Sequence, residues 1–277
     1  MAKSTNSQVH TTLPLEGERG GGLRLVIKIG SNVLTRKDGK LDVTRVSALV
    51  DQVAWLRQQG YEVILVSSGA VACGRRELKV DHELDSVEQR QLFSALGQVK
   101  LIGLYYDLFR EFHIHVGQVL TMKENFQPGE QFDNQQACMR VMLENGVLPI
   151  VNENDTVCVT ELMFTDNDEL SGLIAQMMEA DTLILLSNID GIYTGHPDDP
   201  QSQLIRNVAP STDLSTYIRT EKSAFGRGGM HSKYTTASRV QAAGIRVIIA
   251  NGERENILID LMQNPEVTPH TIFIPKL

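Results

Sequence analysis

Residues 181–191, DTLILLSNIDG, contain the stretch of sequence that decides the fold. Its first half is apolar at nearly every position, which predicts a strand buried on both faces, as in parallel sheets. Similar apolar runs occur at 23–30 (LRLVIKIG), 61–70 (YEVILVSSGA) and 245–252 (IRVIIANG). Longer stretches with apolar residues at helical spacing separate these runs. This alternation predicts an α/β fold built on an open, mainly parallel sheet.

The remaining segments complete the expected order of elements. Further strands are expected at 113–120, 147–155 and 271–275, and an irregular strand or hairpin at 156–164. Helices are expected at about 43–56, 87–112, 133–145, from 166 onward, and up to about 243. The least ordered interior segments are expected at 73–86 and 196–202.

The composition excludes several classes of protein. The chain has 277 residues, of which 42% are hydrophobic and 22% charged, so it is an ordinary globular chain. Its formal net charge of −8 argues against nonspecific binding to nucleic acid or to anionic membranes. No apolar run approaches the roughly 18 residues of a membrane span. Three cysteines without a CxxC pair argue against a disulfide framework and for a reducing, cytoplasmic location.

Polar residues follow the expected strands, and ligands of such sheets bind at the carboxyl ends of strands. These polar exits are KIGSN (28–32), SSGA (67–70), NEND (152–155) and SNIDG (187–191). Lys28 lies inside an apolar run, where an ammonium group is costly unless it meets an anion. The alternative is that Lys28 faces solvent from an edge strand.

Two other segments carry candidate chemistry. GRGGMHSK (226–233) places glycines before an expected helix, where free N–H groups and the helix dipole can bind a phosphate; the alternative is a surface loop. Asp166 is expected to cap a helix, with Glu169 three residues later as in a capping box. Together with NEND, this segment places four carboxylates in two loops, more than turn and cap chemistry explains alone. The P-loop, the dinucleotide fingerprint and the protein-kinase motifs are absent from the sequence.

Seven motifs in order resemble the amino-acid kinase family. They are KIGSNVL, VSSGAVACG, HVGQVL, PIVNENDTV, DNDELS, LLSNIDGIYT and GRGGMHSK, spread over about 23–274. The resemblance implies a three-layer αβα sandwich with an N-terminal lobe at about 23–180 for an amino acid and a C-terminal lobe at about 181–277 for ATP. Residues 1–22 are then expected to be a flexible tail. Within the family, the motifs are most similar to enzymes that phosphorylate the γ-carboxylate of L-glutamate, the first step of proline biosynthesis.

The resemblance also implies roles for particular residues. Lys28 and Lys233 match the lysines that stabilise the transferring phosphoryl group, and Asp168 matches the carboxylate that orients them. Ser68, Asp155 and Asn167 match the positions that bind glutamate. The ATP-binding positions are matched by Lys28, Ser187, Asn188, Arg227, Gly228, Gly229, Met230, His231, Ser232 and Lys233. Bacterial members often have Thr-Asp at 187–188 and Thr at 227. Mg²⁺ is expected to be carried by ATP, and the sequence offers no plausible metal-binding cage of its own.

The residues agree with this chemistry. A glutamate side-chain carboxylate, with a pKa of about 4.3, is already a nucleophile at neutral pH, so transfer needs positioning and charge neutralisation rather than a base. The resemblance further implies a homo-oligomer and L-proline as a feedback inhibitor. Many bacterial members also carry a C-terminal PUA domain, which is not expected here because the sequence ends soon after the kinase motifs. Two alternatives stay open: a kinase of the same fold acting on acetylglutamate, aspartate or a nucleotide, and an amino-acid-binding regulatory protein without catalysis. The KIGSN motif lacks the double glycine usual in acetylglutamate and aspartate kinases.

Overall fold

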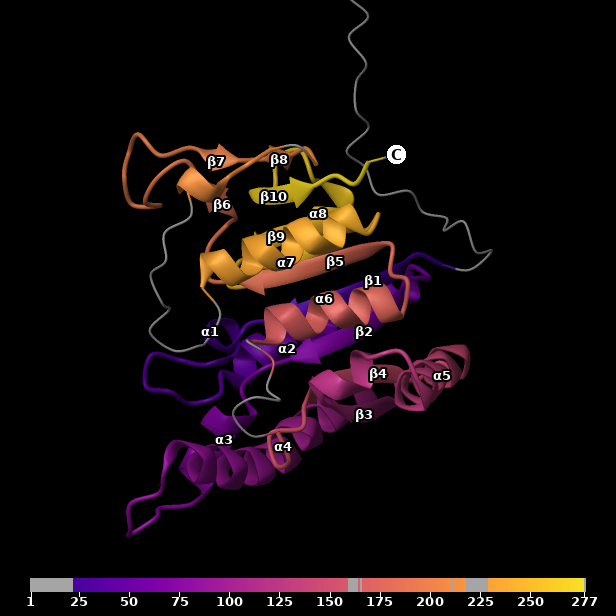
Figure 1. Ribbon diagram of the computed structural model, residues 1–277, viewed down its shortest axis with the longest axis vertical. Coiled ribbons are helices and arrows are strands. Elements are labelled where there is room, and N and C mark those ends of the chain that lie inside the picture. Colours follow the sequence, from indigo (N-terminus) through magenta and orange to yellow (C-terminus); the bar gives the residue numbers. More distant parts are fainter. Residues whose placement is uncertain (1–21, 159–163, 165, 211, 218–228, 277) are drawn as a thin grey trace, which may run out of the picture.

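The computed structural model describes residues 22–158, 164, 166–210, 212–217 and 229–276. Within this part of the chain, eight strands form one central sheet (Figure 1). From one edge to the other they are β3 (Val116–Thr121), β4 (Leu148–Glu153), β2 (Glu62–Ser67), β1 (Arg24–Ile29), β5 (Thr182–Ser187), β9 (Arg246–Asn251), β10 (His270–Phe273) and β8 (Asn207–Val208). Only β9 and β10 pair antiparallel among these strands, so the predicted α/β fold with a mainly parallel sheet is confirmed.

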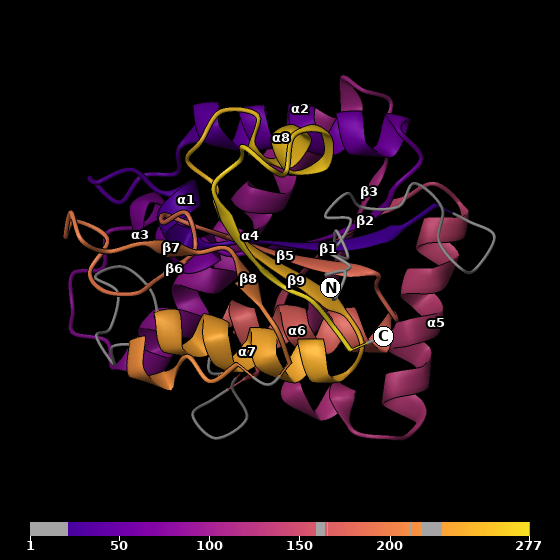
Figure 2. The ribbon, with the colours of Figure 1, turned by 90° about the horizontal axis from the view of Figure 1, so that it is seen from above.

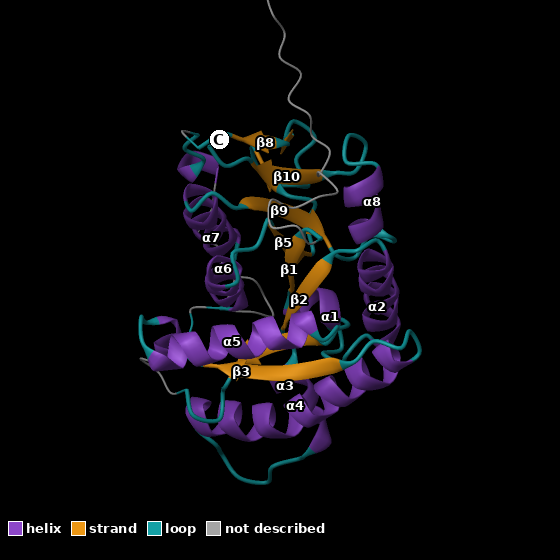
Figure 3. Ribbon diagram, turned by 90° about the vertical axis from the view of Figure 1, so that its right-hand side faces the viewer, coloured by secondary structure: helices purple, strands orange, loops and turns teal. Residues whose placement is uncertain are grey.

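Helices cover both faces of the sheet, as the predicted three-layer sandwich requires. Figures 2 and 3 show α2 (Val43–Gln58) and α8 (Ile257–Gln263) on one face, and α6 (Asn167–Met177) and α7 (Met230–Ala242) on the other. α5 (Glu130–Glu144) packs beside β4 on the α6 side. α3 (Ala70–Glu77) and α4 (Ser86–Arg110) lie at the β3 end of the sheet. Short elements complete the described chain: α1 (Ser31–Leu34), η1 (Lys123–Phe126), η3 (Ser215–Tyr217), and the antiparallel pair β6 (Ile192–Tyr193) and β7 (Leu204–Ile205).

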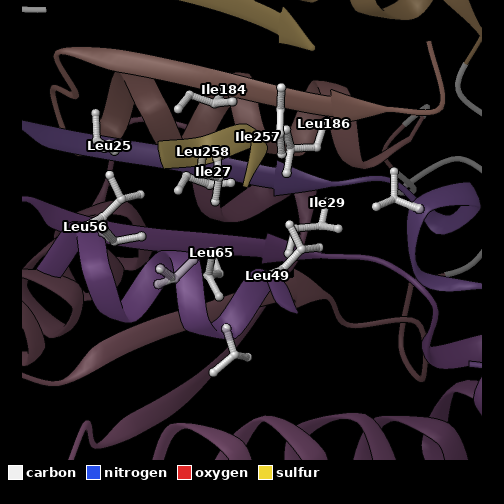
Figure 4. Close-up of a cluster of buried hydrophobic side chains, with 14 of the residues drawn as sticks. Leu25, Ile27, Ile29, Leu49, Leu56, Leu65, Ile184, Leu186, Ile257 and Leu258 are labelled. Carbon is white, nitrogen blue, oxygen red and sulfur yellow. The ribbon is translucent and has the colours of Figure 1, made fainter. Parts of the chain in front are cut away.

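Two hydrophobic cores follow from the alternation of side chains along each strand. In β1, Leu25, Ile27 and Ile29 face the core under α2 and α8, which Figure 4 shows. Val26 faces the second core, under α6 and α7, and Lys28 shares its side of the strand. Each fully buried leucine or isoleucine stabilises the fold by about 1.5–3 kcal/mol. The cores on both faces therefore fix β1, and Lys28 with it, in the middle of the sheet.

The chain leaves β2 through a turn that requires glycine and then packs closely against α4. Gly69 has φ +100°, a left-handed conformation that side chains disfavour. A Cβ at Gly97 would overlap the carbonyl of Ala70, and one at Gly74 would overlap that of Phe93. α3 and α4 thus meet backbone to backbone, which holds the β2–α3 turn against α4.

Some expectations from the sequence are wrong. β1 lies between β2 and β5, so Lys28 is not on a solvent-facing edge strand. The segment expected to be least ordered at 73–86 is confirmed for 78–85, which has no helix or strand, but 73–77 belongs to α3; α8 was not expected. The expected tail lies outside the described residues apart from Gly22, and so does the stretch 159–163 of the strand or hairpin expected at 156–164. Among the described helices, none is long and apolar enough to span a bilayer.

Candidate active site

The carboxyl ends of β1, β2, β4 and β5 meet at one edge of the sheet, and α6 begins there. Asp166 caps α6 as predicted: its Oδ1 accepts hydrogen bonds from the backbone N–H groups of Asp168 and Glu169, at 2.9 and 3.0 Å. The cap fixes the first turn of the helix. It thereby places the Asp168 side chain beneath the end of β1.

Lys28, Asp168 and Lys233 form one buried cluster of charges. The Lys28 Nζ atom lies 2.6 Å from Asp168 Oδ1, and the Lys233 Nζ atom lies 3.0 Å from Asp168 Oδ2. Their exposed fractions are 5%, 0% and 6% for Lys28, Asp168 and Lys233. The structure therefore brings together the three residues predicted to act as one unit, from β1, α6 and α7.

The electrostatics of this cluster favour an incoming anion. Burial raises the pKa of Asp168, but the two lysines outweigh it and hold that pKa below its ordinary value. Burial lowers the pKa of Lys28, and Lys233 adds to this, while Asp168 opposes both. Two ammonium groups share the Asp168 carboxylate, so these three ionised side chains carry one excess positive charge, which the nearby Asp166 carboxylate offsets in part. A buried excess charge is costly until a counter-ion arrives, which a phosphoryl group would be.

The backbone near the cluster carries no side chain at Gly30 or at Gly229. A Cβ on Gly30 would lie 3.0 Å from the Leu186 carbonyl oxygen and 3.5 Å from Lys28 Nζ, so a side chain there would crowd the ammonium. α7 starts after Gly229, which has no side chain to cap its first N–H groups. Those groups and the helix dipole can bind an anion one turn before Lys233.

The other predicted ATP-binding positions lie around this region or outside the described chain. Ser187 ends β5 and is buried, whereas Asn188 is exposed. In the first turn of α7, Met230 and Ser232 are half-buried and His231 is exposed. Arg227 and Gly228 lie outside the described residues.

A network of amides joins two of the predicted glutamate-binding residues. The Asn167 Nδ2 atom lies 3.0 Å from Ser68 Oγ, 3.0 Å from the Ser67 carbonyl oxygen and 3.1 Å from Asn152 Oδ1. The Asn152 Nδ2 atom donates to Gln98 Oε1 at 3.0 Å. The NEND motif contains Asn152 without distinguishing its role. No motif contains Gln98, because a helix pattern does not show which polar side chains point inward.

Asp155, the third predicted glutamate-binding residue, lies in the turn after β4 and is paired with a cation that the sequence did not reveal. Arg90 of α4 donates to Asp155 Oδ1 and to Glu153 Oε2. All three side chains are at most 11% exposed. Within the part of the chain that the structure covers, no group of three or more histidine, cysteine or acidic side chains is arranged to hold a metal ion.

Comparison with known proteins agrees with this geometry. The model of the amino acid kinase family matches residues 23–251. The glutamate 5-kinase of Bacteroides thetaiotaomicron is 64% identical over 253 residues, which cover 91% of this chain and 70% of that protein. The glutamate 5-kinase of Chlorobaculum tepidum is 46% identical over 239 residues, which cover 85% of this chain and 65% of that protein.

Solved structures share the fold at low identity. Carbamate kinase from Giardia lamblia bound to AMP-PNP has a TM-score of 0.66 at 18% identity, over 92% of this chain and 99% of that one. The T. acidophilum isopentenyl phosphate kinase product complex has a TM-score of 0.65 at 15% identity, over 90% and 99%. The family match over most of the chain and the identity to curated members lead to one conclusion: the chain belongs to the amino acid kinase family.

Proposed function

We propose that the chain catalyses the ATP-dependent phosphorylation of the γ-carboxylate of L-glutamate to L-glutamyl 5-phosphate, the first step of proline biosynthesis. The observation that carries this proposal is the buried cluster of Lys28, Asp168 and Lys233 at the end of β1. Relatives named glutamate 5-kinase, 64% and 46% identical, support the choice of substrate.

The glutamate pocket in this proposal lies in the N-terminal lobe, at about 23–180. Asp155 binds the α-ammonium group, and Ser68 and Asn167 orient the substrate between the ends of β2 and α6. The hydrogen bond between Asn167 and Ser68 supports this assignment, because it already places the two side chains together.

The nucleotide in this proposal binds the C-terminal lobe, at about 181–277. Its phosphates face the N-terminus of α7 and Lys233, and its remaining contacts come from Ser187, Asn188 and the segment 227–232. Support comes from the first N–H groups of α7, which no side chain of Gly229 caps, and from the position of Ser187 at the carboxyl end of β5.

Phosphoryl transfer then needs little beyond positioning. The ionised γ-carboxylate attacks the γ-phosphorus of ATP; a carboxyl O–P bond forms as the bridging P–O bond to ADP breaks. Lys28 and Lys233 stabilise negative charge on the transferring group more in the transition state than in the ground state. Asp168 keeps both ammonium groups in place and reduces their mutual repulsion. No proton has to be removed, because the nucleophile is already ionised.

ATP is expected to carry Mg²⁺, and one carboxylate near the charge cluster is a suitable ligand for this ion. Asp166 is 8% exposed, and its Oδ2 makes no hydrogen bond within the described residues, while Oδ1 caps α6. A buried, unpartnered carboxylate oxygen is the kind of hard ligand that Mg²⁺ prefers. We therefore propose that Asp166 helps to hold the ion. When bound, Mg²⁺ supplies charge neutralisation on the phosphates of ATP.

The direct test is an assay with ATP, Mg²⁺, L-glutamate and hydroxylamine, which converts an acyl phosphate into a hydroxamate. The proposal predicts hydroxamate with L-glutamate and little with N-acetylglutamate, because acetylation removes the charge that Asp155 is proposed to bind. An amino-acid-binding regulatory protein would form none. Similar kcat/KM values for the two substrates would instead favour an acetylglutamate kinase.

We also propose that the chain works in the cytoplasm as a homo-oligomer inhibited by L-proline. Its three cysteines are free, which supports a reducing compartment. Light scattering measures the oligomeric state. The hydroxamate assay with added L-proline measures the inhibition.

A further inference from the structure

Arg90 lies near the N-terminal end of α4, and its side chain extends to Asp155 in the proposed glutamate pocket. Its Nε atom donates to Asp155 Oδ1 and its Nη2 atom to Glu153 Oε2. The exposed fractions of the Arg90, Glu153 and Asp155 side chains are 11%, 5% and 10%. Buried carboxylates of this kind need a counter-ion with good hydrogen-bond geometry. Arg90 provides it for both.

The two carboxylates differ in how else they are held. Glu153 is the last residue of β4, and its Oε1 accepts the backbone N–H of Phe164 at 3.1 Å, just before α6. Asp155 lies in the turn beyond the strand. The next residue of α4, Gln91, donates to the carbonyl of Thr156 in the same turn at 2.8 Å. Arg90 therefore extends from a carboxylate fixed by the sheet to one on a turn.

We infer that Arg90 is a positioning residue for the amino-acid substrate: it holds the Asp155 carboxylate in the orientation that binds the α-ammonium group. The inference rests on the proposed function, since it assumes that Asp155 contacts glutamate. Charge supports it. These three side chains, one guanidinium and two carboxylates, sum to one negative charge, which attracts the ammonium group of the substrate.

The geometry also accounts for an arginine at this position. A guanidinium presents several N–H donors in a fixed planar fork and can bind two acceptors at once. A lysine is a point charge on a flexible stem, and it would hold one of the two carboxylates well. Arg90→Lys should therefore retain part of the effect, whereas Arg90→Met, which keeps apolar volume without charge, should lose it.

The test compares glutamate KM, ATP KM and kcat in the hydroxamate assay. We expect Arg90→Met to raise glutamate KM by about 10- to 100-fold, on the scale of one charge-assisted hydrogen bond, with kcat within about threefold. ATP KM should stay within about twofold, and Arg90→Lys should be intermediate. Arg110→Met, at the exposed end of the same helix, is the matched control and should match the wild type.

A double variant, Arg90→Met with Glu153→Gln, separates the effect of losing the positioning contact from the effect of changing the net charge. Because it removes one buried charge of each sign, it is also less prone to misfold than the single variant. It removes one positive and one negative group, so the pocket keeps its net charge while Asp155 no longer has the Arg90 contact. A glutamate KM that stays raised about tenfold or more in folded double variant supports the inference. A KM within threefold of wild type, in either the folded single or the double variant, overturns it and leaves the proposed function intact. A wild-type protein that forms no hydroxamate overturns the proposed function, and this inference with it.

Discussion

Replacing Lys233 by methionine tests the charge cluster with little disturbance of the fold. The Lys233 side chain is 7% exposed, and its Nζ lies 3.0 Å from Asp168 Oδ2. Methionine fills similar space without the charge. Asp168 stays paired with Lys28 at 2.6 Å, so no buried charge is left alone. The cluster changes from one excess positive charge to a neutral pair.

The expected loss is therefore in the rate. Removing one preorganised donor to a developing charge costs about 2.7–4 kcal/mol, or about 10²–10³ in kcat. The free energy of unfolding should change by less than about 2 kcal/mol, because the remaining pair is balanced. The rate is measured as hydroxamate formed at saturating ATP and glutamate, and stability by urea unfolding of the same preparation.

Asp168→Asn provides the contrast. It leaves two buried ammonium groups without their shared carboxylate, so we expect a loss of about 3–5 kcal/mol in the free energy of unfolding together with the loss of rate. The reasoning fails if folded Lys233→Met keeps its kcat within about threefold of wild type. It also fails if both variants lose stability equally, since Lys233 would then be a structural charge.

Three further predictions concern neighbouring groups. Asp155→Ala should raise glutamate KM by about 10- to 150-fold and leave ATP KM unchanged; steady-state kinetics check this, and the opposite pattern would assign Asp155 to the nucleotide pocket. Burial and Lys233 lower the pKa of Lys28, so the Lys28 charge is lost as pH rises through a value below 10.5, and kcat/KM for ATP should fall over that pH range. The Lys28→Arg variant should show no such fall at alkaline pH. A wild-type kcat/KM that is constant up to pH 10.5 would contradict the prediction. Gly30→Ala places a methyl group 3.5 Å from Lys28 Nζ and should reduce kcat by about tenfold, on the scale of a misplaced reacting group. The measurement is kcat together with the melting temperature. An unchanged kcat would show that the substrate does not use the space beside Gly30.

The sequence predicted local structure well where one rule decided it. Asp166 is predicted as a helix cap, and the cap fixes the helical turn that carries Asp168. The apolar runs predicted the parallel strands, and with them the edge at which polar residues gather.

Local sequence patterns do not predict the order of the strands in the sheet. Whether Lys28 is buried depends on whether β1 is central, and β1 owes that position to β5, more than 150 residues later in the chain. The role of Arg90 could not be predicted for a related reason: its carboxylate partners are 63 and 65 residues away, and no periodicity links them. The seven-residue helix α8 was too short for its apolar spacing to be distinctive.

The central position of β1 also has a consequence for synthesis of the chain. β1 is made first among the described strands, yet one of its edges pairs with β5, so that edge stays unpaired until residues 182–187 have been made. At about 5–20 residues per second, the interval is on the order of 8–30 s. An unpaired apolar edge attracts other chains, and a lysine within it opposes such pairing. Lys28 is the one charged side chain in the apolar stretch 25–29 during the interval before β5 is made.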